Sequence, residues 1–198
     1  ALAALTAYAT RPVLVDRDSS DGIEGLIDKQ LFADFKDPLA AKSLEIKQFD
    51  EGTAKTKNFR VEESASGVWT IPSHGGYPAD AADQLKSVSE QLAGLTVLGL
   101  ASEQATDHEM YGVNDPATAA VGATGVGTLI TLSDAKGNEL VNLIVGKSVE
   151  GNANQQFVRK PKEDIVTVTT IDMTKLPTQF DKWIEKDLLK ISTFDVSK

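Results

Sequence analysis

The stretch Ser43–Phe49, which reads SLEIKQF, decides the fold class because apolar and polar residues alternate along it. Alternation with a period of two is typical of a strand that buries one face. The turn Asp50–Thr53 (DEGT) follows, and residues 56–62 alternate again. With a third short strand at residues 68–71, which Pro72 ends, these segments predict an antiparallel meander.

Strand patterns return in the second half of the chain. Residues 128–132 and 139–145 flank the turn Asp134–Asn138, an arrangement that predicts a hairpin. Residues 156–159 and 164–169 form the next expected pair of strands. Hairpins in both halves of the chain indicate that antiparallel pairing dominates the sheet.

Helices are expected between and after these strands. Asp80 is expected to cap a helix whose apolar face carries Leu85, Val88, Leu92 and Leu95. A strand is expected after this helix, at residues 96–100. One helical turn at residues 107–113 ends on glycine, and a C-terminal helix is expected over Leu176–Lys190. The predicted fold class is therefore α+β, with antiparallel strand hairpins and meanders, a central helix, and C-terminal helices packed on one side.

Composition excludes several classes of function. The chain has 198 residues, with 20 basic and 29 acidic side chains, a net charge of −9 and no cysteine. Binding to nucleic acid requires clustered cations, and the densest basic run, Arg159–Lys162, is expected to be a solvated turn. The absence of cysteine excludes disulfides, thiol catalysis and cysteine-based metal sites. The 41% hydrophobic and 25% charged fractions are those of an ordinary soluble globular domain.

The N-terminal region suggests a location outside the cytoplasm. Residues 1–11 are expected to be the tail of a membrane helix or a signal segment, because Ala1–Thr10 is small and apolar and carries no charged side chain. The alternative is a short helix packed on the core. Residues 12–38 are rich in aspartate and are expected to form an acidic tether. Residues 39–198 are expected to form a single globular domain.

Two motifs suggest chemistry that their context does not support. Asp16–Gly22 resembles a calcium loop, but residue 21 is Asp where the turn glycine belongs and residue 27 is Ile where the bidentate acid belongs. Ser73–Gly76 resembles the oxyanion loop of lipases, but the chain has no Gly-x-Ser-x-Gly elbow. A Ser-His-Asp triad built with His74 or His108 has no support from sequence spacing. We therefore interpret Asp16–Gly22 as part of an acidic tether and Ser73–Gly76 as a glycine turn that leads into the helix.

Three further groups contain residue types that could bind a ligand. Asp107–Glu109 could supply metal ligands, but neighbouring residues on a helix point in different directions. The loop Gly122–Gly127 lacks the order of a dinucleotide or phosphate-binding loop, although its backbone amides would suit a small anion. Four aromatic residues could form a ligand platform but are expected to be core residues, namely Trp69, Phe157, Phe180 and Trp183. We therefore predict no catalytic, cofactor-binding or metal-binding residues and no cofactor.

Several short motifs, in a fixed order, carry a resemblance to a known family. They are Trp69–Pro72, Tyr77–Asp80 opening a helix, Tyr111–Pro116, Ile144–Lys147, Phe157–Arg159 and Trp183–Leu189. In these motifs, over about residues 39–192, the chain resembles the bacterial domain-of-unknown-function family 4340. It is similar to a short, single-domain version found in planctomycete-like bacteria.

The resemblance implies a location and a kind of partner. Members of the family usually carry one N-terminal membrane helix, so the domain is expected to face the periplasm or the cell exterior. Some relatives accompany ABC-type transport systems. The expected function is non-enzymatic, through contact with a protein partner such as transporter subunits or a cell-envelope assembly. The alternatives are a binding module for an envelope polymer or small solute and, less favoured, a hydrolase.

Overall fold

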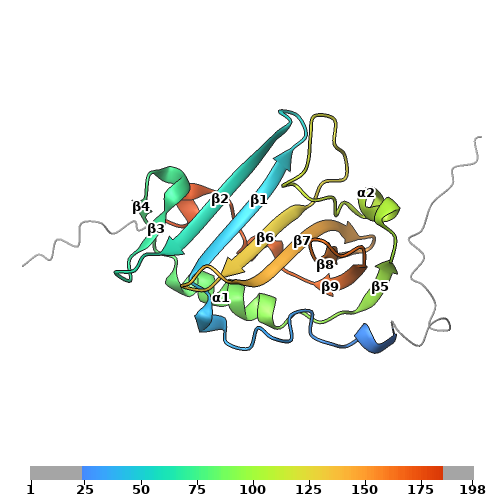
Figure 1. Ribbon diagram of the computed structural model, residues 1–198, viewed down its shortest axis with the longest axis horizontal. Helices are drawn as coiled ribbons and strands as arrows, with labels where there is room; N and C mark the ends of the chain where they lie inside the picture. Colours follow the sequence, from blue (N-terminus) through green and yellow to red (C-terminus); the bar gives the residue numbers. More distant parts are fainter. Residues whose placement is uncertain (1–23, 185–198) are drawn as a thin grey trace, which may run out of the picture.

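The structure, a computed structural model, describes residues 24–184, and these residues form one antiparallel sheet with nine strands (Figure 1). The strands are β1 (Ser43–Asp50), β2 (Lys55–Glu63), β3 (Trp69–Ile71), β4 (Tyr77–Pro78), β5 (Gly99–Ser102), β6 (Thr128–Ser133), β7 (Glu139–Val149), β8 (Asn152–Arg159) and β9 (Val166–Thr170). Their order in the sheet is β4-β3-β2-β1-β6-β7-β8-β9-β5.

The predicted hairpins β1–β2 and β6–β7 are both present. In β1 and β2, Leu44 lies opposite Val61 and Ile46 lies opposite Phe59, so the apolar positions of both strands share one face. β1 also pairs with β6, which joins the N-terminal meander to the β6–β7 hairpin and places Ile46 opposite Ile130. This central pairing makes one continuous sheet out of the two strand-rich halves of the sequence.

Helix α1 (Ala82–Ala93) crosses behind the sheet and covers one face of it (Figure 1). Its buried residues Leu85, Val88 and Leu92 follow the predicted spacing. The position before its first turn is held by Ala81, without a side-chain hydrogen bond, so Asp80 does not cap the helix. The helix therefore depends on burial of its apolar face rather than on an N-cap.

The main core lies between α1 and the sheet. It contains apolar residues from β1, β2, β6, β7 and β8 together with Trp183, and the largest fully buried members are Leu44, Ile46, Ile130, Leu132, Leu143 and Trp183. Trp183 donates from Nε1 to the carbonyl oxygen of Pro177 at 2.7 Å, so its polar atom is satisfied inside the core. Burial of a side chain of this size contributes strongly to stability.

A second, smaller core lies on the opposite face, under helix α2 (His108–Tyr111). Ile144 belongs to this cluster while its neighbour Val145 belongs to the main core, as expected for successive residues of a strand. Tyr111 of α2 packs on Phe157 with ring centroids 4.6 Å apart, and its hydroxyl donates to the carbonyl oxygen of Ala101. The two helices thus cover opposite faces of the sheet.

The predicted α+β class is wrong, because within residues 24–184 the fold is predominantly β with two short α-helices. Leu176–Lys190 was expected to be helical, but residues 176–184 form an irregular segment with one short 3₁₀ turn, η6 (Phe180–Lys182). Residues 185–190 lie outside the described chain. Nor do the helices pack on one side of the sheet.

Contacts with distant parts of the chain explain why residues 176–184 do not form the expected helix. Leu176 precedes a proline, which disfavours helical backbone. Gln179 is extended, Trp183 inserts into the core, and Ile184 forms an antiparallel bridge with Ala79. These tertiary contacts override the helical spacing of the apolar residues in this segment.

The chain before β1 runs along the edge of the main core. It contains the 3₁₀ turns η1 (Glu24–Leu26) and η2 (Pro38–Ala40), and Gln30 forms a bridge with Thr96. Phe35 is buried, with 5% of its surface exposed. Residues 24–38 of the expected tether therefore pack on the domain, whereas residues 12–23 lie outside the described chain.

Three further 3₁₀ turns complete the connections, η3 (Pro72–His74), η4 (Ala105–Asp107) and η5 (Met173–Lys175). Among the helices described between Glu24 and Ile184, none is both long and apolar enough to cross a bilayer.

Candidate functional site

The main candidate surface is the half of the sheet, on the α2 side, that neither α1 nor α2 covers within residues 24–184 (Figure 1). We call it the open sheet face and define it by outward-facing polar residues of β1, β2, β6 and β7, namely Glu45, Lys47, Asn58, Arg60, Glu62, Thr131, Glu139 and Asn142. Their positions alternate with the apolar residues of the main core. Asn58, Arg60 and Glu139 are exposed, and the others are half-buried.

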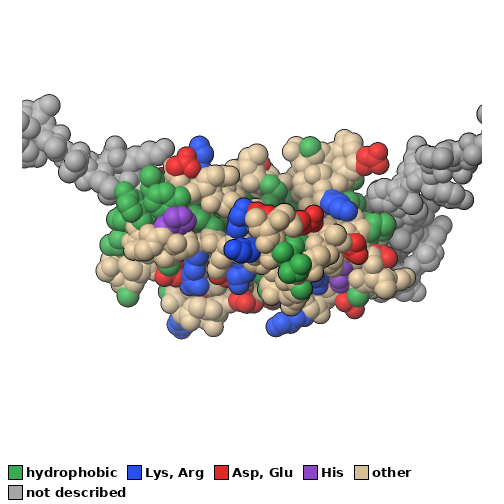
Figure 2. Space-filling view, turned by 90° about the horizontal axis from the view of Figure 1, so that it is seen from above, with side chains coloured by type: hydrophobic (Ala, Val, Ile, Leu, Met, Phe, Trp, Pro, Cys, Tyr) green, Lys and Arg blue, Asp and Glu red, His purple; other side chains and the backbone are tan. Residues whose placement is uncertain are grey.

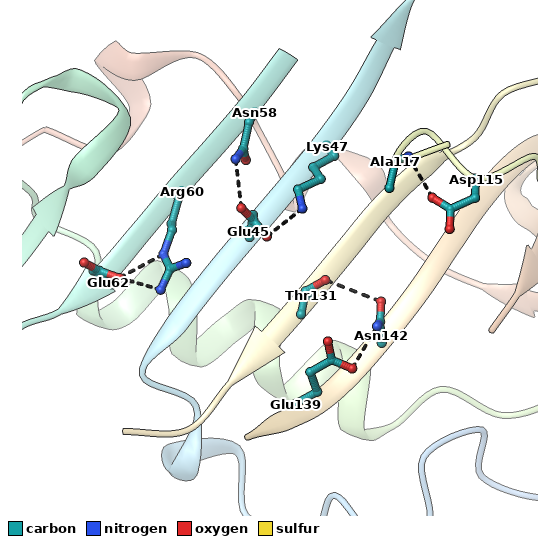
Figure 3. A network of polar contacts seen from close by, with 10 residues as sticks. All are labelled: Glu45, Lys47, Asn58, Arg60, Glu62, Asp115, Ala117, Thr131, Glu139 and Asn142. Carbon is teal, nitrogen blue, oxygen red and sulfur yellow. Dashed lines mark hydrogen bonds and ion pairs between the residues drawn. The ribbon is translucent and has the colours of Figure 1, made fainter. Parts of the chain in front are cut away.

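Most side chains of the open sheet face pair with one another. Glu45 accepts from Asn58 Nδ2 at 2.8 Å and from Lys47 Nζ at 3.2 Å (Figure 3). Arg60 reaches one carboxylate oxygen of Glu62 through both Nε, at 2.8 Å, and a terminal nitrogen, at 2.7 Å. Exposed ion pairs stabilise a fold little, so their main effect here is to hold the side chains in place.

β6 and β7 continue this network toward the middle of the sheet. Asn142 donates from Nδ2 to Glu139 at 2.9 Å and accepts from the Thr131 hydroxyl at 3.4 Å. At the far end the loop that follows α2 borders the face, where the Asp115 carboxylate accepts from the amide of Ala117. The hydroxyl of Thr56 on β2 donates to the carbonyl oxygen of Pro116 at 3.1 Å, which ties this loop to the β1–β2 hairpin.

A second candidate is a cleft of about 430 Å³ beside this loop. We call it the glycine cleft and define it by Glu51, Gly112, Gly125, Gly127, Gly146 and Lys147. It brings together the Gly122–Gly127 loop and the motifs Tyr111–Pro116 and Ile144–Lys147, which lie far apart in sequence. Glu51, at the turn of the β1–β2 hairpin, forms its other side.

Close backbone packing explains the glycines in the cleft. A Cβ atom on Gly125 would collide with the backbone of Glu109, and one on Gly146 would collide with the carbonyl oxygen of Tyr111. A Cβ on Gly127 would lie 2.5 Å from Ile144 and 2.9 Å from the carbonyl oxygen of Gly112. The loop therefore packs directly on β7, backbone against backbone, and the cleft is preformed.

A bulge in β7 sets the position of Lys147. Val145 pairs with Val158 and Ser148 pairs with Gln156, so β7 has one residue more than β8 over this interval. Lys147 donates from Nζ to the carbonyl oxygen of Met110 at 2.8 Å, at the C-terminal end of α2. A cation is favoured at that end of a helix, where carbonyl groups lack partners.

A third candidate is a pocket of about 290 Å³ next to His74. Ile46 and Phe59 belong to its lining, together with Gln48 and Thr178, whose side chains are 3.3 Å apart. His74 stacks on Phe180 with ring centroids 4.5 Å apart. Figure 2 shows a histidine among hydrophobic side chains at the β3–β4 end of the molecule, and acidic and basic side chains side by side in the middle of the view.

The structure places His74 and His108 at opposite ends of the sheet, each with its own hydrogen-bond partner. Ser73 Oγ lies 3.1 Å from His74 Nδ1, and no carboxylate among residues 24–184 lies within hydrogen-bonding distance of that ring. His108 is buried and donates from Nε2 to the carbonyl oxygen of Asp164 at 2.9 Å. A Ser-His-Asp arrangement with either ring is therefore not formed by the described residues.

The side chains of Asp107, His108 and Glu109 diverge. Asp107 accepts from the Ser102 hydroxyl at 2.6 Å, whereas Glu109 accepts from the Thr124 hydroxyl at 2.5 Å. In the part of the chain that the structure describes, no three His, Asp or Glu side chains group as metal ligands. The calcium-like stretch Asp16–Gly22 lies outside the described residues.

The aromatic residues considered as a platform lie in the two cores. Trp183 and Phe157 are buried, and Trp69 and Phe180 pack half-buried against the main core. Arg159, expected in a solvated turn, is buried and donates to the carbonyl oxygens of Val113 and Glu163. Burial lowers the pKa of its guanidinium, and the nearby carboxylates of Asp115 and Asp164 oppose this shift.

The sequence alone did not predict that glycines from separate segments come together in the glycine cleft. The sequence pattern places the glycines at positions 112, 125, 127 and 146 in separate turns or motifs, whereas the structure packs them together. A usable signal was the number of glycines near the predicted strands, since a glycine there often marks a bulge or a close backbone approach.

Comparison with known proteins gives one match. The model of a family described as "Domain of unknown function (DUF4340)" matches residues 69–198. No curated protein and no solved structure shows significant similarity to the chain. The matched region begins at β3 and includes the Gly122–Gly127 loop, the β7 bulge and Lys147, while β1 and β2 precede it.

Proposed function

The chain belongs to the DUF4340 family, and from this premise we propose that it is a non-enzymatic domain that acts through contact with a protein partner. The proposed location is outside the cytoplasm, with one N-terminal membrane anchor. The support for the anchor is the small, apolar stretch Ala1–Thr10 and the resemblance to family members that carry such a helix. The proposed partner is a component of an ABC-type transporter or another cell-envelope assembly.

The observation that carries the proposal is the open sheet face. Its charged groups alternate in sign, with Glu45 beside Lys47 on β1 and Arg60 beside Glu62 on β2. A partner of complementary pattern gains orientation and selectivity from such an arrangement. Because the side chains are already held by mutual contacts, binding would cost little additional conformational entropy.

Three surface carboxyl groups among the described residues are poorly suited to act as general acids. The carboxyl groups with clearly shifted pKa values are Asp50, Asp134 and Asp172, and each pKa is lowered. Hydrogen bonds cause these shifts, chiefly from Lys57 to Asp50, from Asn138 to Asp134 and from Thr174 to Asp172. A general acid needs the opposite shift, which keeps the proton near neutral pH.

Site-specific photo-cross-linking in native membranes tests the proposal. A photoreactive amino acid replaces Asn58, exposed on the open sheet face, and in a second variant it replaces Glu90, exposed on α1 behind the sheet. We expect a discrete adduct of one mass from position 58 and none from position 90. Equal labelling from both positions, or none from position 58, would contradict a specific contact at this face.

Charge reversal then links the adduct to the pattern of charges. Arg60→Glu places like charges beside Glu62 and is expected to abolish the adduct, whereas Lys86→Glu on α1 serves as the matched control. Identification of the adduct by mass spectrometry distinguishes a transporter subunit from another envelope protein. An adduct that persists in Arg60→Glu would exclude the charged pairs as the recognition element.

Two pockets support a second candidate function, binding of an envelope polymer or a small solute. The glycine cleft and the His74 pocket both combine polar groups with a preformed wall. Thermal-shift screening of the purified 198-residue chain against wall fragments and small solutes tests this function. Saturable stabilisation without any cross-linked protein would favour it over the protein contact.

A further inference from the structure

We propose that the glycine cleft binds the oxyanion group of a ligand, a carboxylate or a phosphate. This binding site is separate from the open sheet face and does not depend on a protein partner there. Three features carry it, namely unpaired backbone amides, the cation Lys147 and a wall of backbone that is fixed before binding.

The amides belong to Thr124, Gly125 and Val126, which all line the cleft. None of these three N–H groups donates to an acceptor within residues 24–184. The carbonyl groups of Thr124 and Gly125, by contrast, both accept from Asn114, at 2.9 and 3.1 Å. This stretch of loop thus has its acceptors engaged and its donors available, and successive free amides form anion-binding concavities.

The bridge between Asn114 and Val126 fixes the direction of one donor. Asn114 bonds to the Gly125 carbonyl oxygen and to the Gly127 amide, the two neighbours of Val126. In a parallel bridge of this kind the central residue directs its own N–H away from its partner. The Val126 amide therefore points away from Asn114.

Lys147 supplies positive charge at the same cleft. Its ammonium group donates to the carbonyl oxygen of Met110, which leaves further N–H groups available because an ammonium has three. Its described contacts include no carboxylate, so its charge is not neutralised by an ion pair within residues 24–184. A charge-assisted hydrogen bond to an oxyanion is stronger than one between neutral groups.

The wall of the cleft is rigid, which favours binding by fixed donors. The loop leaves no space for a Cβ atom at Gly125 or Gly127, and Gly127 donates to the carbonyl oxygen of Asn114 at 2.9 Å. Donors that are positioned before binding lose little entropy when the ligand arrives. Glu51 also lines the cleft and opposes an anion electrostatically, as does the Glu109 carboxylate, which accepts from the Thr124 hydroxyl. Removal of the Glu51 charge should therefore tighten binding.

Amide chemical shifts of the ¹⁵N-labelled 198-residue chain test the site. Inorganic phosphate and acetate are titrated separately at constant ionic strength, balanced with chloride. We expect saturable shifts that centre on Thr124, Gly125 and Val126. Saturation by acetate alone identifies a carboxylate site, and saturation by phosphate alone identifies a phosphate site. Shifts that remain linear, or that spread over basic residues elsewhere, would show an adventitious ion only and would overturn the proposal.

Three substitutions make the test specific. Lys147→Met is expected to weaken binding by about tenfold, through loss of one charge-assisted hydrogen bond. Glu51→Gln, at an exposed hairpin turn, is expected to tighten it by about threefold through loss of a repelling charge. Lys136→Met, in the β6–β7 turn, is the control and should change nothing. An affinity unchanged in Glu51→Gln and Lys147→Met alike would refute the assignment.

Discussion

Phe59 and Trp183 pack with ring centroids 5.4 Å apart, and this contact fixes the end of the described chain to a strand near its beginning. Phe59 lies on β2, before the region that matches the family, while Trp183 lies inside that region. The chain thus closes its main core with a residue that the family match does not include. β1 and β2 are accordingly part of the domain and not an appendage to it.

Trp183→Ala should lower the free energy of unfolding by about 3–5 kcal/mol, because it leaves a cavity in the core and removes the Nε1 donor to Pro177. Trp183→Phe should cost less, since it keeps most of the apolar volume. Urea denaturation followed by circular dichroism measures both. Trp69→Phe, at a half-buried position, is the control. A cost below 1 kcal/mol for the alanine variant would contradict the central position of this side chain.

Gly146→Ala should destabilise the protein by more than about 2 kcal/mol, because its Cβ has no space against the backbone of Tyr111 and Gly112. Gly52→Ala is the matched control. Its nearest neighbour is the flexible carboxylate of Asp50 at 3.4 Å, so its stability should change little. Thermal unfolding compares the two variants. Equal melting temperatures would mean that the loop after α2 can shift away from β7 at small cost.

Asp134→Asn should reduce stability at neutral pH, with an effect that depends on pH. The carboxylate accepts from the side-chain amide of Asn138 and from the backbone amides of Asn138 and Lys136 in the β6–β7 turn. These bonds, the side-chain bond above all, lower its pKa below the ordinary 3.8. Its contribution is present above the pKa of the unfolded chain and is lost as the pH falls through the lower folded value. Melting temperatures of the two proteins should therefore converge in acid. A constant difference across pH 2–7 would show that the charge is not involved.

Lys47→Ala and Arg60→Ala should each change the free energy of unfolding by less than about 0.5 kcal/mol, because both cations are paired at the surface. The same variants should weaken the proposed cross-link at position 58. Chemical denaturation and cross-linking yield, measured on one preparation, separate the two effects. If stability fell by several kcal/mol, the open sheet face would be a structural network rather than a surface for binding.

Tyr111→Phe should cost about 1 kcal/mol, since it removes the buried hydrogen bond to the carbonyl oxygen of Ala101 at 3.1 Å while keeping the contact with Phe157. Burial raises the pKa of the Tyr111 hydroxyl above 10.0. The wild-type protein should consequently lose stability as the pH rises above 10, relative to the phenylalanine variant, because the unfolded chain ionises first. Thermal unfolding between pH 7 and 11 checks both the size and the direction.

The strands could be predicted because each strand buries one face in the core and turns the other face away from it. Residues 43–50, 55–63, 128–133 and 139–149 alternate between the main core and the opposite face, and a period of two shows this in the sequence. The strand expected at residues 96–100 begins later, at Gly99, because Thr96 and Val97 pair with the N-terminal segment instead. No local pattern indicates such a distant partner.

The irregular C-terminal segment and the glycine cleft could not be predicted, because both depend on contacts between segments that lie far apart in the sequence. Phe180, Trp183 and Ile184 have helical spacing, but each contacts a different part of the molecule, which a single periodic stripe cannot express. Gly125 and Gly146 meet at the cleft through backbone packing between segments that no spacing rule connects. The sequence carried the residue types of the cleft without their arrangement.

The strand order has a consequence for the way in which the two ends of the described chain are joined. β4 and β5 are the two edges of the sheet, yet they are consecutive in the chain and are joined by α1 alone. Both ends of the described chain attach to this connection, Gln30 at Thr96 and Ile184 at Ala79. The two ends of the described chain lie at opposite sides of the molecule (Figure 1). A hydrogen-bonded path therefore runs from one end of the described chain through α1 to the other end, beside the covalent path through the strands of the sheet.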